Sequence, residues 1–95
     1  MNDTGKRVET GIKLLYFAWV RMRTGTARET VEPPRSVRDV RGLIDWLKTR
    51  SPGHAEAFKE MTAIRVAVNQ TYVPLDHPVK PGDEVAIFPP VTGGR

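Results

Sequence analysis

The residues of this chain that are best suited to chemistry lie in its last segment, FPPVTGGR. Gly93 and Gly94 have no side chains, so the reactive group that this pair can offer is a main-chain carboxylate. A carboxylate that must reach the bottom of another protein's catalytic site needs the narrowest channel when glycine carries it. The alternative interpretation is a frayed terminus that carries no chemistry.

Two prolines precede the glycine pair and direct the residues that follow them. Pro89 and Pro90 have a fixed φ and cannot extend a sheet, so they project the following residues away from the domain at low entropic cost. From Pro90 to Gly94 the extended reach is at most roughly 16 to 18 Å. We therefore predict a flexible functional tail over residues 89–95, in which Val91 and Thr92 also contact a partner.

Arg95 follows the glycine pair and decides which residue carries the carboxylate. While Arg95 is present, the terminal acid belongs to a bulky cation, and direct activation at Gly94 is blocked. We expect either that a peptidase removes Arg95 before activation or that Arg95 was added in the expressed sequence. The third possibility is that the chain is no longer competent for activation.

The composition excludes several classes of function. None of the 95 residues is cysteine, which excludes disulfides, thiol nucleophiles and cysteine-ligated metals. The net charge is +4, but the basic residues are scattered without interleaved stacking aromatics, so we expect solvated faces and no nucleic-acid partner. The longest apolar run, residues 14–20, is too short to span a bilayer and no cleavage site follows it, so we expect a cytoplasmic protein without a membrane partner.

No second reactive site is expected elsewhere in the chain. His54 and His77 have no cysteine or further histidine at ligand spacing, so we predict no metal site. The chain also has no P-loop, glycine-rich nucleotide loop or catalytic triad. A nucleotide would therefore have to be bound by a partner.

The first half of the chain predicts two strands before a helix. Ile12, Leu14 and Tyr16 alternate with Leu15 and Phe17, which predicts a central strand covered on both faces for much of its length. Residues 19–25 are expected to turn the chain. Residues 26–32 alternate charged and apolar side chains, which suits a strand at the sheet edge.

A helix is expected after the proline pair at residues 33–34. Ser36 is the predicted cap, with Asp39 at the third position near the positive end of the helix dipole. The helix should pack on the sheet through apolar residues at spacings of three and four: Val37, Val40, Leu43, Ile44 and Leu47. Ser51-Pro52-Gly53 should end this helix, and residues 55–61 should add a further short helical turn.

The remaining residues predict three more extended segments. Residues 64–68 alternate apolar and other side chains, which predicts a strand with one buried face. Asn69-Gln70 should turn the chain into a short strand at residues 72–73. Lys80-Pro81-Gly82-Asp83 has the proline and glycine of a type II turn, directly before a last strand at residues 84–88.

The order of these elements predicts an α+β domain over residues 11–88 with a β-grasp (ubiquitin-like) fold, a mixed sheet of about five strands with one main helix packed across one face. A ferredoxin-like fold is the main alternative. It needs a second crossover helix, which the proline-rich residues 70–83 cannot supply. Residues 1–10 are polar and lack periodicity, so we expect a mobile N-terminal extension.

Two segments carry a resemblance to a known family: KLLYFAWVR near the start, and VAVNQTYVPLDHPVKPGDEVAIFPPVTGG at the end. The chain resembles the small subunits of molybdopterin synthase, which are ubiquitin-like sulfur carriers. The resemblance covers Gly11 to Gly94. It is most specific where the Pro-Gly-Asp turn, the Phe-Pro-Pro segment and the glycine pair occur in register, and the middle of the chain matches only in element order.

The resemblance implies a sulfur carrier for molybdenum cofactor biosynthesis that is not an enzyme on its own. Gly94, preceded by Gly93, would be adenylated with ATP and converted to a thiocarboxylate, and the tail would enter the large synthase subunit. There it would donate sulfur to cyclic pyranopterin monophosphate, two transfers making the dithiolene of molybdopterin. The implied partners are the large subunit, in a heterotetramer, an adenylating E1-like enzyme that uses the ATP, and a sulfur donor protein; the chain itself would bind no cofactor.

Three further side chains are candidates for contact with a partner. Phe88 should face outward where the tail departs and act as an aromatic anchor, although it could instead complete the core. Phe17 is open to the same two interpretations. Arg21 could pair with an acidic group of a partner or be solvated.

Two other kinds of function remain open. A sulfur carrier for thiazole synthesis or a ubiquitin-like modifier would use the same glycine end, but thiazole carriers are typically shorter and lack the Phe-Pro-Pro segment. A non-catalytic β-grasp interaction module would leave Gly93, Gly94 and Arg95 as an inert end.

Overall fold

Five short strands form one mixed sheet at the centre of the molecule. The computed structural model describes residues 11–90. The strands are β1 (Ile12–Tyr16), β2 (Arg28–Val31), β3 (Arg65–Val68), β4 (Thr71–Val73) and β5 (Glu84–Phe88). They lie in the order β2-β1-β5-β3-β4, in which β1 and β5 are parallel and the other neighbours antiparallel. This topology confirms the predicted β-grasp sheet.

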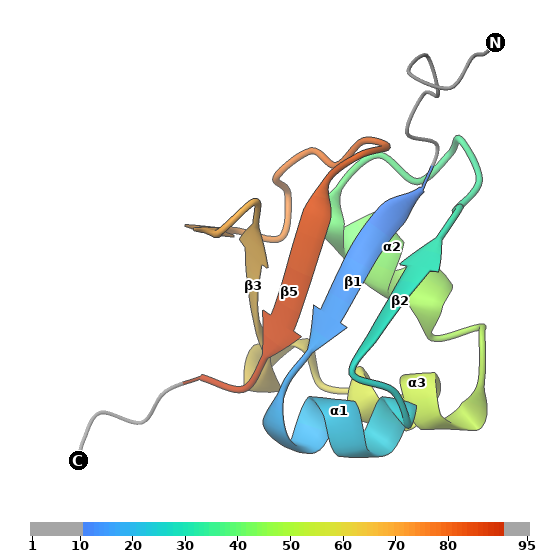
Figure 1. Ribbon diagram of the computed structural model, residues 1–95, viewed down its shortest axis with the longest axis vertical. Helices are drawn as coiled ribbons and strands as arrows, with labels where there is room; N and C mark the ends of the chain where they lie inside the picture. Colours follow the sequence, from blue (N-terminus) through green and yellow to red (C-terminus); the bar gives the residue numbers. More distant parts are fainter. Residues whose placement is uncertain (1–10, 91–95) are drawn as a thin grey trace, which may run out of the picture.

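The helices cover one face and one end of this sheet (Figure 1). They are α1 (Ala18–Thr24), α2 (Val40–Leu47), α3 (Pro52–Ala57) and the short 3-10 helix η2 (Met61–Ala63). α2 crosses one face of the sheet, whereas α1 and α3 lie side by side at the end where β1 and β5 finish (Figure 1). Within residues 11–90, no helix has the length and hydrophobicity that a membrane crossing requires.

The hydrophobic core lies between α2 and the inner face of the sheet. Ile12, Leu14 and Tyr16 of β1 are buried there, while Lys13 is exposed and Leu15 is half-buried on the other face. The prediction that the first strand is covered on both faces is therefore wrong, because the helices pack on one face only. The middle strand is β5, which lies between β1 and β3.

Residues 18–24 form a helix where a turn was predicted. α1 ends at Gly25, whose φ of 84° is left-handed and whose backbone N–H donates to the carbonyl of Arg21. A glycine at this position is the usual end of a helix because it adopts positive φ without a Cβ clash. Val20 is the buried residue of α1, and the helix turns the chain from β1 toward the edge strand β2 as a connection between antiparallel neighbours.

The main helix begins later than predicted. Asp39, not Ser36, is its N-cap, and the Asp39 Oδ1 atom accepts a hydrogen bond of 2.8 Å from the Gly42 N–H. Val37 consequently lies before the helix. The rest of the predicted apolar stripe is buried as expected: Val40, Leu43, Ile44 and Leu47.

The short helix α3 also differs from its predicted bounds. Ser51 is its N-cap, with its Oγ accepting a hydrogen bond of 3.1 Å from the His54 N–H, and Pro52 occupies the first turn. Residues 51–53 therefore begin a helix as well as following one. This arrangement places α3 at residues 52–57 instead of 55–61.

Two tight turns fix the register of β5, from which the tail departs. Asn69 and Gln70 have φ of 50° and 72°, as in a two-residue hairpin turn between β3 and β4. In the second turn Gly82 has a φ of 94° and the Asp83 N–H donates to the Lys80 carbonyl at 3.1 Å, as predicted for a type II turn. The buried Asp83 carboxylate accepts from the Lys80 N–H at 2.9 Å and from Asn69 Nδ2 at 3.1 Å, which joins the two turns.

Candidate functional site

The tail begins at the end of β5, beside the end of β1. Tyr16 pairs with Ile87 in the parallel ladder, and the next residue, Phe17, donates its backbone N–H to the Ile87 carbonyl at 3.2 Å. Phe17 and Phe88, the residues that follow this pair, therefore occupy neighbouring positions at the same end of the sheet. Pro89 follows Phe88 directly and is half-buried.

Phe88 lies on the outer face of the sheet, which is the face away from α2. Its neighbour Ile87 is buried in the core, whereas Phe88 is half-buried and its ring lies 5.4 Å from that of Tyr72 between centroids. Tyr72 is 69% exposed. The outward orientation that we expected for Phe88 is thus present, while its contact with a partner stays a prediction.

An apolar strip runs across the outer face from β1 to β4. The ladder pairs Leu15 with Ala86, Ala86 with Ala67, and Ala67 with Tyr72, so these four side chains share the face. In the described part of the chain, no helix covers this face (Figure 1). Tyr72 was not among the partner-contact residues predicted from the sequence. The available signal was its place next to Val73 in a strand, because successive residues of a strand face opposite sides of the sheet.

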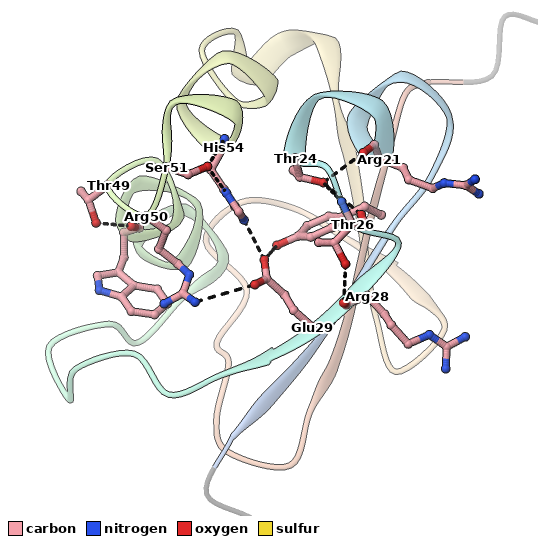
Figure 2. Close-up of polar contacts among 11 residues, drawn as sticks. Arg21, Thr24, Thr26, Arg28, Glu29, Thr49, Arg50, Ser51 and His54 are labelled. Atoms are coloured by element: carbon pink, nitrogen blue, oxygen red, sulfur yellow. Dashed lines mark hydrogen bonds and ion pairs between the residues drawn. The ribbon is translucent and has the colours of Figure 1, made fainter.

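Phe17 and Arg21 belong to the first turn of α1, a helix that contacts β5. Phe17 is the N-cap of α1 and is 49% exposed. Arg21 is exposed, and its side chain points away from Glu29 in Figure 2. The fold therefore gathers Phe17, Arg21 and Phe88 at one end. Pro90 is the last described residue, and the predictions for Val91, Thr92, Gly93, Gly94 and Arg95 fall outside residues 11–90.

A group of polar side chains, the Glu29 cluster, joins β1 and β2 to α3 (Figure 2). Tyr16 Oη donates to Glu29 Oε2 at 2.7 Å, and His54 Nε2 lies 2.7 Å from the same oxygen. Ser51 Oγ lies 2.7 Å from His54 Nδ1, and Arg50 Nη2 lies 3.7 Å from Glu29 Oε1. Every polar atom of the His54 ring thus has a partner.

The protonation states in this cluster follow from burial and hydrogen bonding. Burial and the hydrogen bond to Glu29 raise the pKa of Tyr16 far above its ordinary value, so its hydroxyl remains a donor. Burial acts to raise the pKa of Glu29, but hydrogen bonds from His54 and Tyr16 outweigh it and leave that pKa below its ordinary value. Glu29 is therefore ionised at neutral pH. Residues 11–90 contain no group of three His, Cys, Asp or Glu side chains that could hold a metal ion.

Comparison with known proteins identifies the family. The chain matches the ThiS family over residues 14–94, so the match ends at Gly94 and leaves Arg95 outside. It is 60% identical over 83 residues to the molybdopterin synthase sulfur carrier subunit of Haemophilus influenzae, covering 87% of this chain and 99% of the relative. It is 43% identical over 83 residues to the subunit of that name from Escherichia coli, with the same two shares.

A solved structure agrees with this assignment. A protein from Pyrococcus furiosus, described as a candidate molybdopterin converting factor subunit 1, is 37% identical and has a TM-score of 0.72. The alignment covers 86% of this chain and 99% of that protein. The chain therefore belongs to the ThiS family, in the group of molybdopterin synthase sulfur carrier subunits.

Proposed function

We propose that this chain carries sulfur for molybdenum cofactor biosynthesis on the carboxylate of Gly94. The observation that carries the proposal is the family match, which ends at Gly94. The position of Pro89 and Pro90 supports it, because they follow the outward-facing Phe88 at the end of β5. A tail that starts there has an extended reach of at most roughly 16 to 18 Å from Pro90 to Gly94.

The proposed chemistry uses the main chain and needs no side-chain nucleophile. With Arg95 removed, the Gly94 carboxylate attacks the α-phosphorus of ATP on an E1-like partner and forms an acyl-adenylate with loss of pyrophosphate. Hydrosulfide (HS⁻) delivered by a donor protein then attacks the acyl carbon, the carbon–oxygen bond to AMP breaks, and release of AMP and a proton leaves a thiocarboxylate. Gly93 and Gly94 keep the end narrow enough for both partners' active sites.

The thiocarboxylate end would deliver its sulfur inside the large molybdopterin synthase subunit. Phe88 and Phe17 would anchor the carrier, Arg21 would pair with an acidic group, and the tail residues Val91 and Thr92 would line the way to cyclic pyranopterin monophosphate. The bare outer face supports this docking, because exposed aromatic side chains such as Tyr72 are typical anchors of interfaces. Two such carriers on a pair of large subunits would make the heterotetramer.

The proposal includes a division of the chain into an N-terminal extension at residues 1–10, a domain at residues 11–88 and a tail at residues 89–95. The start of the family match at residue 14 supports the first boundary, and the end of β5 at Phe88 supports the second. A cytoplasmic location is also part of the proposal, because the activation step consumes ATP.

Intact-protein mass spectrometry tests this function. The full chain is treated with a carboxypeptidase that removes C-terminal arginine and is then incubated with the adenylating partner, ATP and the sulfur donor, with an identical mixture lacking ATP as the control. We expect loss of Arg95 in both mixtures and exchange of one oxygen for sulfur at Gly94 only with ATP. Adducts on lysines of other proteins would indicate a modifier instead, and loss of Arg95 without the exchange would indicate an inert interaction module.

A further inference from the structure

α1 carries Arg21 and begins at Phe17, yet little within the helix itself fixes its position. It has seven residues, Val20 is its buried side chain, and its N-cap makes no side-chain hydrogen bond. Helices this short are marginal without tertiary contacts. The N-cap of α1 is held at the end of β5 by the Phe17 N–H to Ile87 carbonyl bond, and the element that α1 contacts most extensively is α3.

Gly53 lets α3 approach the backbone of α1. A Cβ at Gly53 would lie 2.2 Å from the Arg23 carbonyl oxygen and 3.4 Å from its carbonyl carbon. These are main-chain atoms, so they cannot rotate away as a flexible side chain could. One α-hydrogen of Gly53 occupies the direction of that Cβ and points at the carbonyl, as in a C–H···O contact. Any larger residue would push the two helices apart.

The Glu29 cluster ties the same part of α3 to the sheet. His54, the residue after Gly53, has a side chain only 8% exposed and contacts Glu29 of β2, which in turn accepts from Tyr16 at the end of β1. Figure 2 shows the His54 and Arg50 side chains meeting Glu29 from one side. A continuous path of contacts thus leads from the sheet through Glu29, His54 and Gly53 to α1.

We infer that Gly53 and His54 are positioning residues that hold α1, and with it Arg21, in place for docking to the large synthase subunit. The inference rests on the proposed function. This path runs through β2 and α3, whereas Pro89 follows β5, which lies on the other side of β1. Loss of the support should therefore weaken docking and leave the transfer of sulfur within the complex unchanged.

Binding of the full chain to the large subunit, measured by calorimetry, tests the inference. Gly53→Ala and His54→Ala should each raise Kd about tenfold, because they shift α1 while the tail stays intact. The matched control is Val40→Ala, which opens a cavity in α2 and destabilises the fold without touching α1. The control should bind with the Kd of the wild type.

A double-mutant cycle identifies the route of the effect. If Gly53 acts through Arg21, Gly53→Ala should weaken binding little further in a chain that already carries Arg21→Ala. In a chain that carries Phe88→Ala, the loss of binding from Gly53→Ala should be added in full. In the reconstituted synthase with thiocarboxylated carrier, Gly53→Ala should raise KM and leave kcat unchanged.

A milder variant serves if the alanine variants do not fold. Tyr16→Phe removes one hydrogen bond from the Glu29 cluster and keeps the ring, and it should raise Kd roughly twofold to threefold.

The outcomes separate this inference from the proposed function. Wild-type binding together with unchanged Kd for the Gly53, His54 and Tyr16 variants overturns the positioning role alone. An equal loss in Val40→Ala does the same, because it indicates a general loss of stability. Full additivity with Arg21→Ala does so too, because the effect of Gly53 then does not pass through Arg21. Failure of the wild-type chain to bind the large subunit overturns both.

Discussion

Glycine serves two different purposes at single positions of this chain. At Gly53 the missing Cβ permits a close approach between two backbones, since a Cβ there would lie 2.2 Å from a carbonyl oxygen. At Gly94, in our proposal, it permits a carboxylate to travel down a narrow channel. The first purpose is structural and can be read from contacts, and the second depends on a partner.

Gly94→Ala tests the second purpose directly. The added methyl group widens the end of the tail, so we expect sulfur transfer to be abolished. The melting temperature should be unchanged, because our proposal places Gly94 outside the core. Thr92→Ala is the matched control in the same tail and should keep transfer. Full transfer by Gly94→Ala would contradict the channel argument, and a collapsed melting curve would show that the tail is part of the fold.

Glu29 provides a pH-dependent test at the residue scale. Its folded pKa is lowered from 4.5, so ionised Glu29 contributes stability that is present above the unfolded pKa and is lost as pH falls through the folded value. Glu29→Gln keeps the shape and removes the charge, and should reduce the free energy of unfolding at pH 7 by about 1 to 2 kcal/mol.

Urea unfolding at a series of pH values measures this difference. The difference in free energy of unfolding between wild type and Glu29→Gln should disappear as the pH falls below 4.5. The stability lost when Asp83, whose pKa is also lowered, becomes protonated affects both proteins equally. A gap that stays constant down to strongly acid pH would show that the charge of Glu29 does not stabilise the fold.

At the scale of elements, the sequence correctly predicted those segments whose signals all lie within a few consecutive residues. The last strand, Glu84–Phe88, and the turn before it were predicted with their correct bounds, because proline, glycine and a period of two occur together there. α1 was missed because it is short and continues the apolar run of β1. The Glu29 cluster was missed because it joins residues 25 positions apart, which no local pattern reveals.

The N-cap of α2 gives a prediction at this scale. Asp39→Ala removes the acceptor of the Gly42 N–H and should lower the free energy of unfolding by about 1 kcal/mol. Asp39→Ser supplies another capping oxygen and should recover most of the loss, as measured by urea denaturation. A similar loss in Ser36→Ala, with none in Asp39→Ala, would place the cap at the position predicted from the sequence.

The outer face of the sheet gives a second prediction. Phe88 is half-buried against Tyr72 and contributes little to the core, so Phe88→Ala should weaken binding to the large subunit roughly thirtyfold and change the melting temperature little. Thr30→Ala, at an exposed position of the edge strand β2, is the control and should bind like the wild type. Equal binding by Phe88→Ala would remove this face from the proposed interface.

At the scale of the whole molecule, one face of the sheet builds the fold and the other is left for contact. The helices cover the inner face and one end, no helix of residues 11–90 covers the apolar strip on the outer face, and β5 lies in the middle of the sheet (Figure 1). The tail and its chemistry stay predictions, which the sequence could offer because they depend on consecutive residues and on the family resemblance. Phe17 and Tyr72 could be placed beside Phe88 only once β1 and β4 were placed in the sheet.

Sulfur transfer in a reconstituted synthase is the most direct test of the central claim that the Gly94 carboxylate carries the sulfur. The chain ending at Gly94 as a thiocarboxylate is mixed with the large subunit and cyclic pyranopterin monophosphate, and molybdopterin is quantified. We predict one molybdopterin for every two carriers consumed, and none from the chain that retains Arg95. No product from the thiocarboxylate, or equal product from the chain that retains Arg95, would contradict the claim.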